Sequence, residues 1–439
     1  MYMDNKISVA AATAVGLGAI IGAGIFVLSG TAIALAGPDA LIAFILVGIL
    51  AIIIGFELGE LGSIAPNVKG GVYSYVYKAF GSELGFITGI LRYFSLATSI
   101  SAITLGFGSY FTSLFGISNT LIIPTAILLI FILSILNIVG IKKAVKADFG
   151  LVVIKLVILA IFIVAAIVFA ISSKSFSPAN FSIIQSKNNI GDIFAASIAV
   201  FFAYSGFQTI STFTSRVKGG ANGAAKAIIY SIIISMIFYV LVIVALIIMV
   251  PASKYTISAD PLSFALQYIK APAWLFIVVS VGALIATISA TIAMILSASR
   301  TVYQISADKL LPKILRKYNR KSDVAINGVI LSGIIGVIML FSGNIYIIAA
   351  ISNFGLMFSY LIGSFAIIHF RRNKINGSFK TPLYPYLPII AIVMLLAFIA
   401  GMPQEATTFG VIMIISLLVI YYFLREIDGK RIIRVHLFR

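Results

Sequence analysis

The sequence contains no cysteine and few charged residues. Of its 439 residues, 10% are charged and 61% are hydrophobic, and the mean hydropathy is +1.15. Without cysteine the chain has no disulfide, no thiolate metal site and no redox pair. A water-soluble fold cannot bury that share of apolar side chains, which excludes a soluble enzyme core, a disordered scaffold and a secreted disulfide scaffold. The composition therefore predicts an integral membrane protein.

Long apolar stretches fill the chain and leave short segments between them. A helix that crosses a bilayer needs about 20 residues. These runs lack the alternation of a membrane β-barrel. The fold class predicted is therefore an all-α integral membrane protein of a single domain, 1–439, with about twelve transmembrane helices. The stretches are 7–36, 39–64, 82–112, 119–140, 148–171, 190–214, 224–250, 272–305, 324–342, 345–370, 384–401 and 405–424.

Charges of one sign gather between alternate stretches. The chain has 31 Lys and Arg against 13 Asp and Glu, a net charge of +18, and most of the cations fall in the loops of one side. Because cytoplasmic loops carry the excess of Lys and Arg, this pattern predicts a multi-pass protein of the cell membrane, in contact with membrane lipids, with both termini in the cytoplasm. The surplus follows from topology, so a nucleic-acid partner is not expected.

Glycine interrupts two of the stretches at mid-membrane depth. The first stretch has four glycines between residues 16 and 24, and each costs about 1 kcal/mol of helix stability relative to Ala. Close helix packing is one explanation, because Gly18-x-x-x-Gly22 fits the small-xxx-small pattern. The sixth stretch carries a second such run, FFAYSGFQ at 201–208. A pair of interrupted spans favours a broken helix in each.

The interval of five spans between the breaks predicts an inverted repeat. Two helices an odd number of spans apart cross in opposite directions, so 7–171 forms repeat one, 190–370 forms repeat two and 384–424 adds two helices. A break exposes amides at Gly22, Ala23 and Gly24, which can hold a carboxylate, and carbonyls near Ile20, which can hold an ammonium. Together these groups recognise the zwitterionic backbone of an amino acid.

Several segments in order resemble the amino acid–polyamine–organocation (APC) permease family, which shares the leucine-transporter fold. The similarity covers the two predicted repeats almost from end to end. The segments are GAIIGAGIF at 18–26 in the first helix, PNVKGGVYSYVYKAFG at 66–81 between helices 2 and 3, N-x-x-G-x-K at 137–142, FFAYSGF at 201–207 in the sixth helix and SASRTVYQISADKLLP at 297–312.

The resemblance implies a substrate amino acid between helices 1 and 6, with the ring of Phe202 as an outer gate. The substrate carboxylate would bind the amides at Gly22 to Gly24. The sequence departs from the family at Gln208, where members often have an acid, and at 214–224, which lacks the usual acidic pair and both prolines. These departures make cationic substrates less expected. The carbonyls implied for the ammonium are those of Ile20, Phe202, Ala203 and Ser205.

Lys155 lies inside the fifth stretch, seven residues beyond Asp148 and so about 10 Å into the helix. A lysine in hydrocarbon is a functional hypothesis by default, and snorkelling to the cytoplasm is the structural alternative. The resemblance implies proton coupling, since a lysine at this position takes the place of a sodium ion in proton-coupled members. Its charge would also repel a sodium ion from that site.

Three further charges fall within predicted spans. Glu57 and Glu60 share a face of helix 2, and Arg92 lies early in helix 3 at a compatible depth. One interpretation is a structural ion pair and the other is a gate or relay. A metal site is not expected, because His369 and His436 are the only histidines and both lie near cytoplasmic ends.

The sequence as a whole predicts a secondary active transporter, most simply a proton-coupled symporter of neutral amino acids that works by alternating access. The alternatives are an ion-independent amino acid exchanger and a polyamine or cationic amino acid transporter. A membrane-embedded enzyme would need acidic or His clusters at a membrane face, and a sensor would need a soluble signalling domain. Neither feature is present in the sequence, so we expect no catalytic residues and no cofactor.

Overall fold

A computed structural model describes residues 6–66, 70–139, 148–173, 190–319 and 324–427. Helices dominate these residues, and two short strands, β1 (Tyr318–Asn319) and β2 (Val324–Ala325), pair antiparallel. The α-helices are α1 (Val9–Ile20), α2 (Gly24–Ala36), α3 (Ala40–Ile64), α4 (Val72–Phe80), α5 (Ser82–Phe115), α6 (Ile122–Val139), α7 (Asp148–Ser173), α8 (Ile190–Tyr204), α9 (Gly220–Met249), α10 (Pro261–Tyr268), α11 (Ala273–Ala307), α12 (Ile326–Met339), α13 (Ile345–Arg372), α14 (Tyr386–Ala400) and α15 (Gln404–Ile427).

Each of the twelve predicted stretches contains a helix. Within the described residues, eight helical segments are long and apolar enough to cross a membrane, and α1, α8, α12 and α14 are shorter apolar helices. Two of these four are short because the helix breaks, since α1 ends at Ile20 and α8 ends at Tyr204. The prediction of an all-α multi-pass membrane protein is confirmed.

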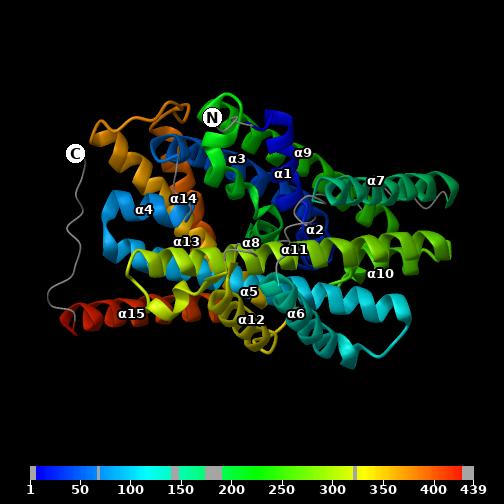
Figure 1. The fold of residues 1–439 in the computed structure, drawn as a ribbon. Coiled ribbons are helices and arrows are strands. Elements are labelled where there is room, and N and C mark those ends of the chain that lie inside the picture. Colours follow the sequence, from blue (N-terminus) through cyan, green and yellow to red (C-terminus); the bar gives the residue numbers. More distant parts are fainter. Residues whose placement is uncertain (1–5, 67–69, 140–147, 174–189, 320–323, 428–439) are drawn as a thin grey trace.

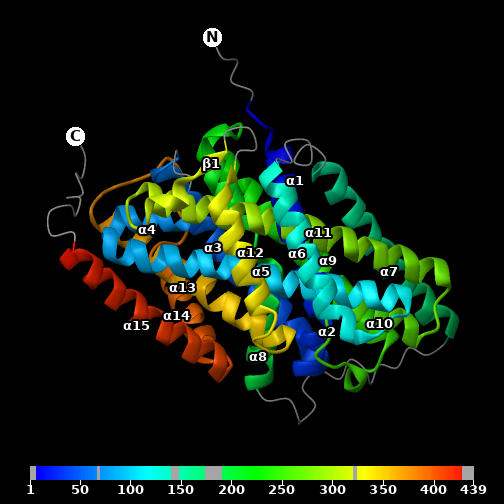
Figure 2. The ribbon, with the colours of Figure 1, turned by 60° about the horizontal axis from the view of Figure 1, so that its bottom comes forward.

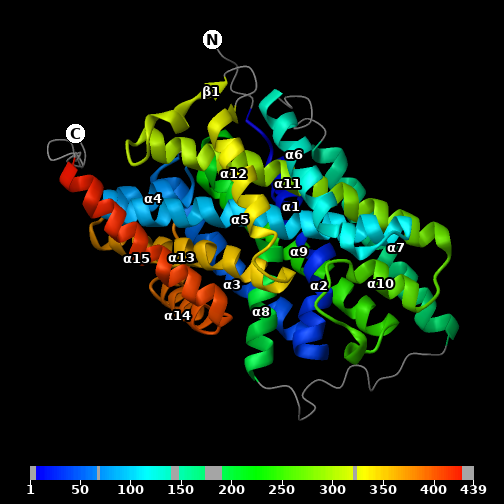
Figure 3. The same cartoon turned by 90° about the horizontal axis from the view of Figure 1, so that it is seen from below.

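The helices form one bundle around two long central members. α5 and α11 run side by side along its length, and α13 packs against α5 (Figures 1 and 3). α9 packs against α1 and α3, and α3 also packs against α8. α14 and α15 lie on the side of the bundle away from α7 (Figure 2). The short helices α4 and α10 lie toward opposite ends of the bundle (Figure 1).

Both predicted interruptions are present in the first and sixth spans. Residues 21–23 separate α1 from α2 without helical structure. In the sixth span, α8 gives way at Gly206 to the 3-10 helix η5 (Phe207–Arg216). Gly206 has φ +131°, which L side chains rarely adopt, so the break requires glycine at this position. The inverted relation between residues 7–171 and 190–370 stays a prediction.

Candidate functional site

The last carbonyl groups of α1 receive donors from three directions. The amide of Ile21 donates to the Leu17 carbonyl at 2.7 Å, and the ammonium of Lys155, on α7, lies 3.5 Å from the Gly18 carbonyl. The Ile20 carbonyl accepts from a tyrosine hydroxyl on α9. A helix end carries partial negative charge and unsatisfied carbonyls. The break in the first span is therefore held by contacts from α7 and α9.

Tyr239 joins the two broken helices. Its buried hydroxyl lies 2.8 Å from the Ile20 carbonyl of α1 and 2.9 Å from the Ala203 carbonyl of α8. One hydroxyl hydrogen can serve only one of these acceptors at a time. Two of the carbonyls expected to hold an ammonium thus already have a protein donor. Tyr239 could not be singled out from the sequence, because α9 contains two tyrosines and only helix packing buries Tyr239 while it leaves Tyr230 exposed.

We expect Tyr239→Phe to weaken amino acid binding while leaving the bundle folded, because the ring fits unchanged and only the hydroxyl that links α1 to α8 is lost. A hydrogen bond of this kind contributes about 0.5–1.5 kcal/mol, which corresponds to a loss of affinity of roughly two- to tenfold. Binding of a labelled amino acid to the purified variant measures this change. Unaltered affinity would show that the link between the helices does not support the site.

The amides expected to bind a carboxylate are not equivalent. The Gly22 amide donates to the Ile20 carbonyl at 2.7 Å, so it closes the turn of the break. The amides of Ala23 and Gly24 have no hydrogen-bond partner among the described residues, as is normal for the first turn of a helix. They lie at the positive end of the α2 dipole. Ala23 and Gly24 are therefore the residues of this break that can receive an anion through their amides.

The two glycines of this turn face different neighbours. A Cβ atom at Gly24 would lie closer than 3.0 Å to the backbone and side chain of Ala203, so α2 and α8 touch here. A Cβ atom at Gly22 would lie 3.4 Å from the Cβ of Ala290 on α11, an ordinary contact. Gly24 is thus required for helix contact, and a side chain at Gly22 points toward α11.

The break in the sixth span has its own polar contacts. The Ser205 amide donates to the Phe202 carbonyl at 3.1 Å. The side-chain oxygen of Gln208 accepts from the Gly206 amide at 2.9 Å and from the hydroxyl of Tyr360, on α13, at 2.8 Å. Gln208 therefore caps the break and connects it to α13. Phe202, the expected gate, is buried, with 5% of its surface exposed.

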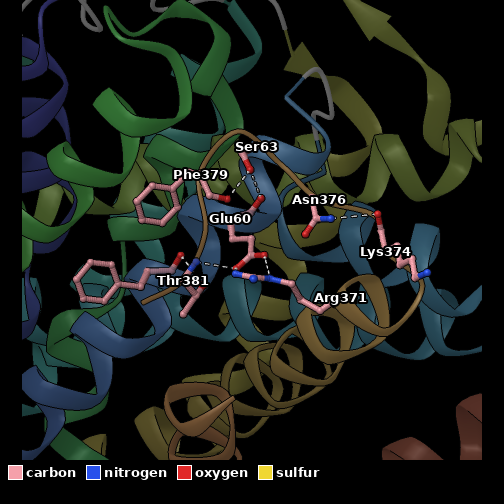
Figure 4. Close-up of polar contacts among 8 residues, drawn as sticks. Glu60, Ser63, Arg371, Lys374, Asn376, Phe379 and Thr381 are labelled. Carbon is pink, nitrogen blue, oxygen red and sulfur yellow. Dashed lines mark hydrogen bonds and ion pairs between the residues drawn. The ribbon is translucent and has the colours of Figure 1, made fainter. Parts of the chain in front are cut away.

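The buried carboxylate of Glu60, on α3, lies in a second polar cluster. Its oxygens accept from Nε and Nη2 of Arg371, at 2.5 and 3.0 Å, and from the Thr381 amide at 2.7 Å. Figure 4 shows Glu60 between Arg371 and the segment after α13 that carries Phe379 and Thr381. The ion pair expected with Arg92 is thus wrong for Glu60, which pairs with Arg371 at the end of α13. Arg371 lies just beyond the predicted stretch 345–370, so this contact was not predicted.

We expect Glu60→Gln to lower the thermal midpoint of the purified protein by several degrees. An amide cannot balance the Arg371 guanidinium, and breaking a buried pair by removing one partner costs about 3–5 kcal/mol. Adding Arg371→Gln should recover part of the loss, since the unbalanced charge is then removed. If the decreases in thermal midpoint of the two single variants simply add up in the double variant, the two residues are not coupled and this prediction is contradicted.

Glu57 lies one turn before Glu60 on α3 and contacts a different residue. One of its oxygens accepts from the Ser364 hydroxyl at 2.6 Å, and the other has no partner among the described residues. Arg92, on α5, is also buried. Among the described residues no hydrogen bond joins Glu57 or Arg92 to the amides of α2, so any part that they play as a gate or relay stays a prediction.

Asp260 is a carboxyl group outside the membrane-spanning helices, directly before α10. Burial raises its pKa to about 6, and a hydrogen bond with Ser113 acts in the opposite direction. This carboxyl changes charge in the same pH range in which proton-driven transport is measured. A variant at Asp260 therefore controls for titration outside the membrane.

The model of the amino acid permease family matches residues 7–424. The chain belongs to the amino acid permease family. The permease is 30% identical over 416 residues to a methylthioribose transporter of Bacillus subtilis, which covers 89% of this chain and 87% of the relative. It is 26% identical over 432 residues to the branched-chain amino acid permease BcaP of the same organism. This match covers 93% of this chain and 90% of the relative.

A further relative is a mitochondrial cationic amino acid transporter of Arabidopsis thaliana, 26% identical over 372 residues, with coverage of 81% of the permease and 60% of the relative. These relatives are all transporters, and their names give three different substrates. The permease is therefore a multi-pass membrane transporter and not an enzyme. The family to which it belongs implies an amino acid as its substrate.

Proposed function

We propose that the permease carries neutral amino acids across the cell membrane together with a proton, by alternating access. The observation that carries this proposal is the pairing of the two breaks. The free amides of Ala23 and Gly24 start α2, while the carbonyls of Phe202 and Ala203 end α8, and α2 touches α8 between them at Gly24. Amides beside carbonyls match the carboxylate and the ammonium of one amino acid backbone.

Lys155 supports the choice of a proton as the coupling ion. Its ammonium reaches the Gly18 carbonyl in the last turn of the broken first helix, with 1% of the residue exposed. A charged lysine there links α7 to α1 and occupies the place of a cation. A neutral lysine loses that attraction, so gain and loss of one proton favour different helix arrangements. An ion-independent exchanger is the alternative and would need no such change.

The orientation and the substrate class rest on the sequence. We propose that both termini lie in the cytoplasm, since most Lys and Arg fall on that side. A neutral substrate is favoured because Gln208 stands where an acid would attract a cation, and its oxygen is engaged by Gly206 and Tyr360. A polyamine or cationic amino acid is the alternative.

Competition binding tests the proposed recognition. Purified permease is incubated with labelled leucine and with unlabelled alanine, leucinol, lysine or spermidine. We expect alanine to compete and leucinol to fail, since leucinol keeps the amine and side chain of leucine but lacks the carboxylate that the α2 amides bind. Displacement by spermidine or lysine without displacement by alanine would overturn the proposal in favour of a cationic substrate.

A further inference from the structure

Arg92 is a buried cation that the described protein leaves without an anion. It lies ten residues after the start of α5, with 7% of its surface exposed. No hydrogen bond or ion pair of its guanidinium is present within the described residues. Moving an ion from water into a protein interior costs several kcal/mol of free energy, and an ion without a partner regains little of it. A guanidinium in this position is costly unless it meets an anion during the transport cycle.

The carboxylates of neighbouring helices are directed elsewhere. Glu60 pairs with Arg371, and Glu57 accepts from Ser364, with Glu60 as its charged neighbour. α13, which packs against α5, contains no Asp or Glu. The described chain therefore supplies Arg92 with no counter-charge. An anion from outside the protein can supply it.

α13 packs against α5 and reaches the break in the sixth span through Tyr360. Its hydroxyl donates to Gln208, which in turn accepts from the Gly206 amide. Its ring stacks on Phe207, the first residue of η5, with centroids 5.8 Å apart. α5 and α13 are in close contact beside it, since a Cβ atom at Gly355 would lie closer than 3.0 Å to the Leu91 carbonyl. Tyr360 thus connects α13 to the broken helix, beside the stretch of α5 that carries Arg92.

We propose that Arg92 is a second carboxylate subsite of the permease, on the stretch of α5 that packs against α13. This inference rests on the proposed function, because the carboxylate belongs to the transported amino acid. A guanidinium presents paired donors that match a carboxylate, and charge-assisted hydrogen bonds of this kind are the strong ones. Two sources share this chemistry: the α-carboxylate of the neutral substrate after it leaves the α2 amides, and the side-chain carboxylate of an acidic amino acid that competes with that substrate.

The test measures leucine uptake and its inhibition by glutamate in proteoliposomes that contain the full-length permease or Arg92→Gln. Arg372→Gln is the matched control, because it removes the same charge from an exposed arginine at the end of α13. If the subsite takes a side-chain carboxylate, glutamate inhibits the wild type and Arg92→Gln raises the glutamate concentration needed by about tenfold or more, with the leucine KM unchanged.

If the subsite takes the α-carboxylate, glutamate inhibits no better than alanine, and Arg92→Gln lowers the maximal leucine uptake by about tenfold at unchanged KM. Either pattern, with a thermal midpoint like that of the wild type, supports the proposal. The proposal is overturned if the leucine KM, the maximal uptake and the glutamate inhibition all stay within about twofold of the wild type. Such a change is smaller than the loss of one charged hydrogen bond would cause. A loss of uptake together with a lowered midpoint in detergent reports impaired folding, and Arg92→Lys then decides.

Should Arg92→Gln fail to fold, Arg92→Lys provides the measurement, because lysine keeps the charge without the paired donors. The same shift in glutamate inhibition or maximal uptake, smaller in size, is expected, and wild-type values in this variant would overturn the proposal. Failure of the proposed function is a separate outcome. It would appear as a wild-type permease that takes up no leucine at all, whatever residue stands at position 92.

Discussion

Gly206→Ala is expected to abolish amino acid uptake. The residue has φ +131°, and a Cβ atom there would lie closer than 3.0 Å to the Ala19 carbonyl of α1. A non-glycine residue in such a conformation costs about 1–3 kcal/mol, and crowding of a packed contact adds about 1–3 kcal/mol. Relief of the clash requires α1 and the sixth span to separate at the break. The site between them would then lose its geometry.

Uptake and binding of labelled leucine by the purified variant measure this effect. Gly150→Ala is the control, because Gly150 lies in α7, a Cβ atom there would meet nothing within 4 Å, and alanine favours the helix. The control should transport as the wild type does. Wild-type uptake by Gly206→Ala would refute the requirement for close contact between the two breaks.

Lys155→Ala is expected to remove the acceleration of uptake by an inward proton gradient. The ammonium of Lys155 is buried against the Gly18 carbonyl at the negative end of α1. Without it, protonation no longer changes the attachment of α7 to the broken helix, so a proton gradient has no effect on the helix arrangement. Leucine binding should stay within about twofold of the wild type, since loss of a contact remote from the ligand leaves the ligand's own interactions in place.

Asp260→Asn controls for pH effects outside the membrane. The pKa of Asp260 is raised to about 6 by burial, so its carboxylate form is disfavoured in the folded protein and its contribution to stability falls as pH rises from about 4 through 6. The Asn variant removes that titration but should keep the response to a proton gradient. A gradient response that survives in Lys155→Ala and disappears in Asp260→Asn would move the coupling site to the loop before α10.

The helical spans and the two breaks follow from local sequence, which explains why they could be predicted. Apolar runs of bilayer length set the spans, and the glycines at 16–24 and Gly206 weaken the helix where it breaks. Lys155 stands out because a charge in an apolar run needs a partner. The structure supplies the Gly18 carbonyl as that partner.

The contacts between helices could not be predicted in the same way. Tyr239 lies on α9, far along the chain from the carbonyls it contacts, and Arg371 reaches Glu60 across 311 residues of sequence. Both contacts depend on how the helices pack, and a single sequence does not determine packing. Gly24 is a further example. A glycine in an apolar helix can mark either a break with a free amide or a close contact between helices, and the sequence alone does not distinguish the two.

The most direct test of the proposed mechanism is uptake of labelled leucine into proteoliposomes with the pH gradient and the sodium gradient imposed separately. The mechanism predicts accumulation driven by an inward proton gradient, no response to sodium, and loss of the proton response in Lys155→Ala. Accumulation driven by sodium alone, or uptake that needs only an amino acid on the opposite side and ignores both gradients, would contradict proton coupling through Lys155.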